Sequence, residues 1–223
     1  MKPFYENPFA KTILLFLLIF FAGWRSNSGA SDESWFNNSA TFSISPKFSL
    51  KLTQETRCLD ITYSDPYLNN VQGGIAFNLP KNFYIATLYK REHVKIQDAA
   101  SNENRITLEA GWKTKASKDL DIDLRFRTEI REYEEDEQED HLRFRMRIRG
   151  KYNMTIGKLN IKPFVALETF GKNKVYTVQR TRLYIGTIFP LSNHVEFHIS
   201  YLWLATRNKE SIHILHSGFD LKF

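Results

Sequence analysis

Residues 141–151 constrain the fold of this chain more than any other stretch, because charged and apolar residues alternate there without a break. Successive side chains of a β-strand point to opposite faces. As a strand, this stretch would set Leu142, Phe144, Met146 and Ile148 against Arg143, Arg145, Arg147, Arg149 and Lys151. Five cations in a row repel one another unless acids or water lie close. The pattern predicts a strand with one face in an apolar environment and the other against acids or water.

The preceding segment, residues 120–131, has the same alternation and supplies acids. Its odd-numbered residues are charged, and most of its even-numbered residues are apolar: Asp121, Asp123, Arg125, Arg127, Glu129 and Arg131 against Leu120, Ile122, Leu124, Phe126 and Ile130. Two such neighbours are typical of a transmembrane β-barrel, whose strands face lipid on one side and a polar interior on the other.

Turn residues divide the rest of the chain into alternating segments of roughly 10 to 14 residues, the length of barrel strands. The count is eleven, whereas bacterial single-chain barrels have an even number. Either residues 35–44 lie outside the wall, which leaves ten strands, or one strand is unrecognised, which gives twelve. The predicted fold class is all-β, a transmembrane antiparallel β-barrel of about 10 to 12 strands.

Connections of two lengths alternate along the chain. Short turns near Pro46, Pro80, Ser117, Gly157 and Ser192 are separated by longer polar connections near Pro66, Ala99, Glu135, Lys172 and Asn208. Outer-membrane barrels have short periplasmic turns and longer outer loops. We therefore expect the last strand to run towards the periplasm, and residues 95–103 to form one of the long loops.

The first 30 residues have the pattern of an export signal. Lys2 and Lys11 precede an apolar run at residues 13–22, and Ser28-Gly29-Ala30 matches a small-x-small cleavage site. The run is shorter than the roughly 20 residues that span a bilayer. We predict a cleaved secretory signal peptide at residues 1–30 and an outer-membrane barrel at residues 31–223. No later apolar run has helix length, so a closed barrel is the structure that satisfies the backbone in lipid.

Composition excludes several other classes of protein. Cys58 is the one cysteine, so neither an internal disulfide nor a cysteine-based metal cluster is expected. The net charge of +6 is spread over strands that mix Arg with Asp and Glu, which argues against a nucleic-acid partner. The acidic run at residues 134–140 lacks the ligand order of a calcium loop and is interpreted as a solvated outer loop. No metal or cofactor is expected.

The chain ends on an aromatic residue. Within residues 212–223, one face carries Leu215, Phe219, Leu221 and Phe223. This pattern resembles the C-terminal assembly signal of Gram-negative outer-membrane proteins and predicts the barrel-assembly machinery as a partner. The alternative is the amphipathic last strand of a soluble sheet.

Several short pieces, in order, resemble one known family. They are Gln54-Glu55-Thr56-Arg57, Tyr89-Lys90-Arg91, Asn104-Arg105-Ile106, Leu124-Arg125-Phe126-Arg127, Leu142-Arg143-Phe144-Arg145-Met146-Arg147, Lys162-Pro163-Phe164 with Glu168, Arg182-Leu183-Tyr184-Ile185-Gly186 and Ser200-Tyr201. The chain resembles the Gram-negative family catalogued as domain of unknown function 2490, predicted outer-membrane barrels. The resemblance implies an outer-membrane location among lipid and lipopolysaccharide, and it carries no established reaction or ligand.

Charged residues at interior positions form the candidate site. This candidate lumen charge ladder consists of Arg105, Glu109, Lys113, Asp121, Asp123, Arg125, Arg127, Glu129, Arg143, Arg145, Arg147, Arg149, Arg180 and Arg182. One interpretation is that ion pairs between strands plug a narrow barrel, because desolvated arginines need acids. The other is that the excess of arginine attracts anions into a pore.

An outer-membrane lipid-modifying hydrolase is the alternative from another class. His213 and Ser217 share the outward face of the last strand, but four residues along a strand span about 13 Å, too far for a hydrogen bond. His194, His198, Ser192 and Ser200 offer other pairs, and no Gly-x-Ser-x-Gly motif is present. We therefore expect no catalytic residues and a non-enzymatic barrel. It would be a narrow pore for small solutes, anions among them, or a structural membrane component.

Overall fold

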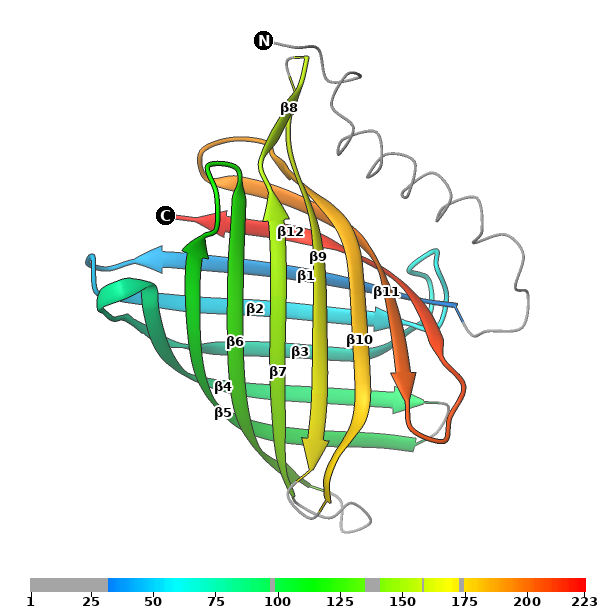
Figure 1. Ribbon diagram of the computed structural model, residues 1–223. Coiled ribbons are helices and arrows are strands. Elements are labelled where there is room, and N and C mark those ends of the chain that lie inside the picture. The colour runs from blue at the N-terminus through cyan, green and yellow to red at the C-terminus, as the bar shows by residue number, and fades with distance from the viewer. Residues whose placement is uncertain (1–31, 97–98, 135–140, 158, 173–174) are drawn as a thin grey trace.

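The computed structural model describes residues 32–96, 99–134, 141–157, 159–172 and 175–223. The predicted signal peptide and most of the acidic run at 134–140 lie outside these residues. Within them, no helix is long and apolar enough to cross a membrane. Antiparallel neighbours dominate the strand pairing, and the strands close into a barrel (Figure 1).

The barrel wall is a single sheet of strands. In chain order its strands are β1 (Asp32–Ser43), β2 (Phe48–Cys58), β3 (Pro66–Asn78), β4 (Phe83–Ile96), β5 (Ala99–Lys115), β6 (Leu120–Tyr133), β7 (His141–Tyr152), β9 (Leu159–Lys172), β10 (Val175–Pro190), β11 (Val195–Thr206) and β12 (Ile212–Lys222). A short strand, β8 (Met154–Ile156), pairs with the start of β9 and extends beyond the wall (Figure 1). A 3-10 helix, η3 (Pro80–Asn82), joins β3 to β4.

Eleven strands form the wall within the described residues, so one neighbouring pair must be parallel. That pair is β1 and β12, with Asp32 beside His213 and Thr41 beside Lys222. Eleven lies inside the predicted range, but both even-numbered alternatives are wrong. Residues 35–43 of the first segment belong to the wall, and the wall has no twelfth strand in the part of the chain described. A Cβ atom on Gly218 would lie 1.7 Å from the carbonyl oxygen of Asn37, so glycine permits the close approach at this seam.

The two ends of the barrel differ in their connections. We call the end where β2, β6 and β11 finish the loop end, and the end where β1, β3, β5 and β10 finish the turn end. The long loop predicted at 95–103 is wrong, because β4 and β5 continue pairing to Ile96 and Ala99. The longer connection near Lys172 is wrong as well, since only residues 173–174 separate β9 from β10.

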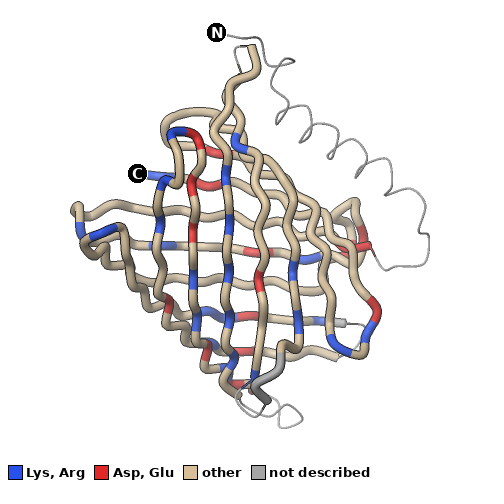
Figure 2. The backbone as a smooth tube through the Cα atoms, in the orientation of Figure 1, with Lys and Arg blue, Asp and Glu red and all other residues tan. Residues whose placement is uncertain are grey.

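Apolar side chains cover the outward face of the wall. On β6 and β7 they include Phe126, Phe144, Met146 and Ile148, and Phe126 is 55% exposed. Exposure of large apolar side chains over a wide surface suits lipid and not water. Charged positions recur along the same strands (Figure 2) and point to the interior by the alternation of the pleat.

The interior also holds an apolar cluster on one side. Trp35 of β1, Leu202 and Leu204 of β11 and Ile214 of β12 are buried together, and Tyr184 of β10 packs against them. These residues fill the lumen beside the parallel seam. The remaining interior is therefore displaced towards β2 through β9, where most of the charges lie.

Candidate functional site

A cavity of about 630 Å³ occupies the barrel interior, and cations dominate its wall. Fifteen described Lys and Arg residues line it: Lys51, Arg57, Lys90, Arg105, Lys113, Arg125, Arg127, Arg131, Arg143, Arg145, Arg147, Arg149, Lys172, Arg180 and Arg182. Six described acids line it: Glu55, Glu92, Glu109, Asp123, Glu168 and Asp220. Even with the buried carboxylates Glu103 and Glu129 added, positive charge exceeds negative charge.

Most of the predicted ladder lines this cavity. Twelve of its members do so: Arg105, Glu109, Lys113, Asp123, Arg125, Arg127, Arg143, Arg145, Arg147, Arg149, Arg180 and Arg182. Glu129 is buried behind them, 2.5 Å from Arg143 and 2.6 Å from Arg145. Asp121 lies away from the cavity, 4.0 Å from Lys151.

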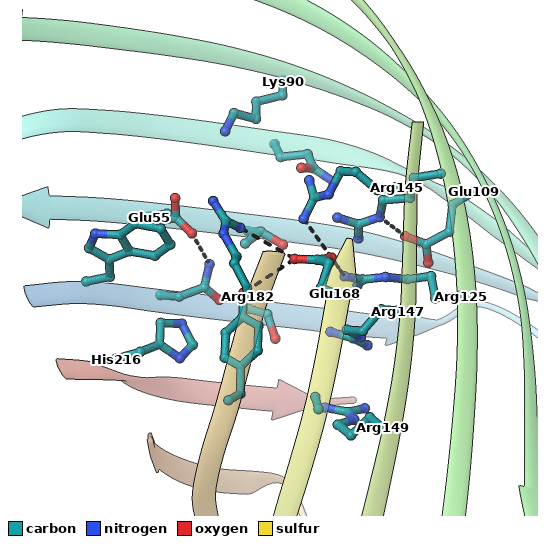
Figure 3. A pocket seen from close by; sticks show the side chains of 18 of the residues that line it. Glu55, Lys90, Glu109, Arg125, Arg145, Arg147, Arg149, Glu168, Arg182 and His216 are labelled. Carbon is teal, nitrogen blue, oxygen red and sulfur yellow. Dashed lines mark hydrogen bonds and ion pairs between the residues drawn. The ribbon is translucent and has the colours of Figure 1, made fainter. Parts of the chain in front are cut away.

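Glu168 is the centre of the densest ion-pair cluster. Its side chain is 1% exposed, and its oxygens lie 2.9 Å from Arg145, 3.0 Å from Arg125 and 3.5 Å from Arg182. The hydroxyl group of Tyr184 donates a further hydrogen bond at 3.4 Å. Figure 3 shows these side chains converging from β6, β7, β9 and β10. The cluster joins four strands across the interior and narrows it.

Towards the loop end most of the cations have close carboxylate partners, with Arg180 an exception among the described residues. Arg57 lies 2.6 Å from Glu55, and Arg105 lies 2.6 Å from Glu103. Lys90 pairs with Glu92. This half of the barrel matches the plugged interpretation, because desolvated charges at these distances neutralise one another.

Towards the turn end the pairing is looser. Asp123 is shared by Arg147 at 3.4 Å and Arg149 at 3.3 Å, and the Nε atoms of both arginines are buried without a hydrogen-bond partner. Lys51 lies 3.6 Å from Glu109, which also pairs with Arg127 at 2.5 Å. Lys113 is the cross-strand partner of Asp123 but forms no ion pair with a carboxylate among the described residues. This half of the interior matches the pore interpretation.

Three aromatic residues belong to the site, although charge alone does not reveal them. Trp35 lies beneath the guanidinium groups of Arg57 at 3.8 Å and Arg182 at 4.8 Å, and Phe170 lies beneath that of Arg182 at 4.7 Å. Tyr84 lies beneath two lysines. Their position in the strand alternation could have identified them. Tyr84, for example, shares the even-numbered, inward face of β4 with Lys90.

One serine and one histidine meet inside the barrel. Ser200 Oγ lies 3.2 Å from Nδ1 of His216, while His198 lies 3.5 Å from Asp220. Ser200 is 3% exposed and does not line the cavity. A nucleophile must be reachable by its substrate, and this hydroxyl group is enclosed by the wall.

The outward pair considered for a hydrolase is not assembled. His213 contacts the hydroxyl group of Tyr201, and Ser217 lies 2.8 Å from the hydroxyl group of Tyr63. Each side chain thus has a different partner.

The aromatic residues of the predicted assembly signal lie on the outer wall. The ring of Phe219 lies 5.2 Å from that of Phe197, and Phe223 stacks on Phe42 at 5.2 Å. Leu215 and Leu221 share this outward face of β12 with them. The last strand is therefore joined to its neighbours on both sides, β11 and β1.

One protein family model matches nearly the whole barrel. A family model described as "Protein of unknown function (DUF2490)" matches residues 32–212, from the first residue of β1 to the first residue of β12. The chain belongs to the DUF2490 family. The matched range includes the parallel-paired first strand, so this strand is part of the family domain. No curated protein matches this DUF2490 chain.

Among solved structures, the DUF2490 barrel is similar to the one titled "Crystal Structure of the Beta Domain of the Bordetella Autotransporter Brka". The TM-score is 0.55 at 12% sequence identity, over 86% of this chain and 97% of that chain. At this identity the likeness shows the fold, an outer-membrane type of β-barrel, and transfers no activity.

Proposed function

We propose that this DUF2490 protein is a non-enzymatic outer-membrane barrel that acts as a narrow, anion-preferring pore for small solutes. The observation that carries the proposal is the excess of Lys and Arg over Asp and Glu on the cavity wall. A cationic wall attracts anions and favours their passage, as charged rings do in other pores. The location proposed is the outer membrane of a Gram-negative bacterium, after export by a signal peptide at residues 1–30 and with the turn end in the periplasm.

The apolar outward face and the barrel fold support that location. The partners that belong to the proposal are outer-membrane lipid and lipopolysaccharide at the outward face, and the barrel-assembly machinery at the C-terminal strand. Replacing Phe223 with Ala would slow insertion by that machinery without changing the lumen. Equal insertion rates for both proteins, measured in proteoliposomes that contain the machinery, would remove the assembly signal from the proposal.

A structural membrane component without conductance is the competing function of the same class. The tight pairs at the loop end favour it, whereas the loosely paired Arg147 and Arg149 favour the pore. Single-channel recording of the refolded chain in planar bilayers separates the two. We expect discrete openings and a reversal potential that indicates anion preference. Silence from folded protein, or cation preference, would contradict the pore.

Substitution at the two loosely held arginines tests the origin of the preference. In Arg147→Gln and Arg149→Gln, the anion preference should fall, because each change removes one cation from the cavity wall. The matched control is Arg91→Gln, which removes an exposed cation from the outward face of β4, where it pairs with Glu134. An unchanged reversal potential in the lumen variants would show that these charges do not set selectivity.

The contact between Ser200 and His216 is the one observation that favours the hydrolase alternative. Ester hydrolysis by the refolded protein that disappears in Ser200→Ala would replace the non-enzymatic proposal. We expect no hydrolysis above that of an empty-vesicle blank, because the hydroxyl group is enclosed.

A further inference from the structure

A second cavity, of about 620 Å³, lies at the turn end and adjoins the lumen cavity. The two cavities share four lining residues, Thr41, Lys51, Tyr84 and Lys113. We call these four residues the neck. They come from β1, β2, β4 and β5. Thr41 is the cross-strand partner of Lys51, and Lys51 and Lys113 both lie over the ring of Tyr84. A solute that moves between the lumen and the turn end along these cavities passes the neck.

Tyr84 organises the neck by holding two ammonium groups. The Nζ atom of Lys51 lies 4.8 Å from the centre of its ring, and that of Lys113 lies 5.0 Å from the same centre. An ammonium group over an aromatic face is attracted by the ring quadrupole. The Nζ atom of Lys51 also lies 3.6 Å from Glu109, beyond hydrogen-bond distance. Neither lysine donates a hydrogen bond among the described residues, so their N–H donors stay available to a ligand.

Gly111 allows the ring to occupy this place. It is the cross-strand partner of Tyr84, and a Cβ atom on it would lie 2.2 Å from Cε1 of Tyr84. Any larger residue would therefore push the ring away from β5. The glycine keeps the aromatic ring against the wall, and the ring positions the two lysines.

The two carboxylates near the neck already form ion pairs. Glu109 pairs with Lys51 and Arg127, and Asp123 pairs with Arg147 and Arg149. Lys113 adds a cation whose cross-strand partner is Asp123 but which forms no ion pair in the described chain. Five cations therefore face two carboxylates around the neck, an excess of three positive charges. Binding of one monovalent anion would neutralise only one of these three positive charges.

We propose that Lys51 and Lys113 form a binding site for a small oxoanion with two or more negative charges, a step that rests on the anion pore proposed above. Ammonium groups are compact charges with three donors each, a common means of binding phosphate-like anions. A site between two cavities holds the anion in transit and selects multiply charged oxoanions over chloride. Binding by two flexible lysines also allows release, which conduction requires.

Calorimetric titration of the refolded full chain in detergent tests the site directly, with inorganic pyrophosphate as the probe and chloride as the background anion. We expect Lys113→Gln and Lys51→Gln each to weaken binding at least about tenfold, which is about 1.4 kcal/mol. Lys113→Arg should retain part of the affinity. Neither Gln variant leaves an unpaired carboxylate, since Glu109 keeps Arg127, so both variants should fold.

The matched control is Arg180→Gln. Arg180 lines the same cavity on β10 and has no ion pair among the described residues, but it is not a neck residue. Unchanged pyrophosphate binding in this variant supports a local site. An equal loss in Arg180→Gln, or no binding by the wild-type protein, overturns the site.

Bilayer recording distinguishes failure of the site from failure of the pore. Pyrophosphate binding at the neck by a protein that shows no conductance would keep the site and reject the pore. Anion currents that pyrophosphate blocks equally in wild type and in Lys113→Gln would keep the pore and reject the site.

Discussion

Glu168 shows how much the interior depends on single carboxylates. Its oxygens form ion pairs with Arg125, Arg145 and Arg182, and its side chain is 1% exposed. Replacing Glu168 with Gln leaves buried guanidinium charges without their common partner. We expect a loss of about 3–5 kcal/mol in the free energy of unfolding, measured by urea titration in lipid vesicles.

An exposed carboxylate provides the comparison. Glu134 pairs with Arg91 at 2.6 Å, but the two side chains are 39% and 53% exposed. Glu134→Gln should leave the unfolding midpoint unchanged within error, because exposed ion pairs contribute little. Equal shifts for the two variants would show that the Glu168 cluster is not a stabilising centre.

Asp60, in the connection at residues 59–65, gives a prediction for pH dependence. Hydrogen bonds from the hydroxyl groups of Ser64 and Thr62 lower the pKa of Asp60 from 3.8 to about 2. The contribution of these bonds to loop order is complete above pH 3.8, and it is lost as pH falls towards 2. The amide of Ser64, 3.1 Å from Asp60 Oδ1, should titrate in NMR spectra with a midpoint near 2. A midpoint near 4, or the same titration in Asp60→Asn, would contradict this.

At the scale of the residue, alternation predicts the face of the sheet on which a side chain lies but not the residue with which it pairs. The alternation of β6 and β7 predicts that their charged residues face the interior, because a period of two gives each strand one apolar and one charged face. The role of Glu168 was not predictable in this way. Its partner Arg125 is on β6, two strands away from β9 in the wall, and their contact depends on side chains that reach past β7.

At the scale of the element, strand limits were predictable where lipid imposes the pattern. Residues 120–131 and 141–151 agree closely with β6 (Leu120–Tyr133) and β7 (His141–Tyr152). The polar residues 95–103 resemble a loop because no apolar face marks them. Their backbones still pair between β4 and β5, a contact that needs no apolar side chain.

Two outward positions of β6 test which part of the wall lies in lipid. Phe126 is at mid-strand, whereas Glu132 is near the loop end. Phe126→Arg should cost about 2–4 kcal/mol of folding free energy in vesicles, and Glu132→Arg about 0–1 kcal/mol, because the penalty falls with distance from the midplane. Guanidinium titration in phosphocholine vesicles measures both. Equal costs would place the two positions at equal depth.

At the scale of the whole molecule, the parallel seam is the feature that sequence could not predict. The turn residues divide the sequence into eleven segments, but the even number of strands in other bacterial barrels favours ten or twelve. The outward face of β1 is also interrupted by polar residues such as Asn38, which donates a side-chain hydrogen bond to Gln54 at 3.2 Å. No local pattern in β1 indicates whether its neighbour β12 runs with it or against it.

Cross-linking tests the direction of the seam. Ala40 and Leu221 are paired on the outward face of β1 and β12. In a Cys58→Ser background, Ala40→Cys with Leu221→Cys should form a disulfide, visible as a mobility shift of the folded barrel on non-reducing gels. Phe36→Cys with Leu221→Cys is the control, since four residues along a strand span about 13 Å. Cross-linking of the control pair and not the first would contradict the parallel register.

The same seam decides on which side of a membrane each end of the wall emerges. β1 starts at the loop end beside His213, and β12 finishes at the turn end, so Asp32 and Phe223 leave the barrel in opposite directions (Figure 1). A peptide fused ahead of Asp32 would be displayed from one surface of the bilayer, and a peptide fused behind Phe223 from the other. An odd number of strands thus makes this barrel a two-sided anchor, able to present different cargo to two compartments from one chain.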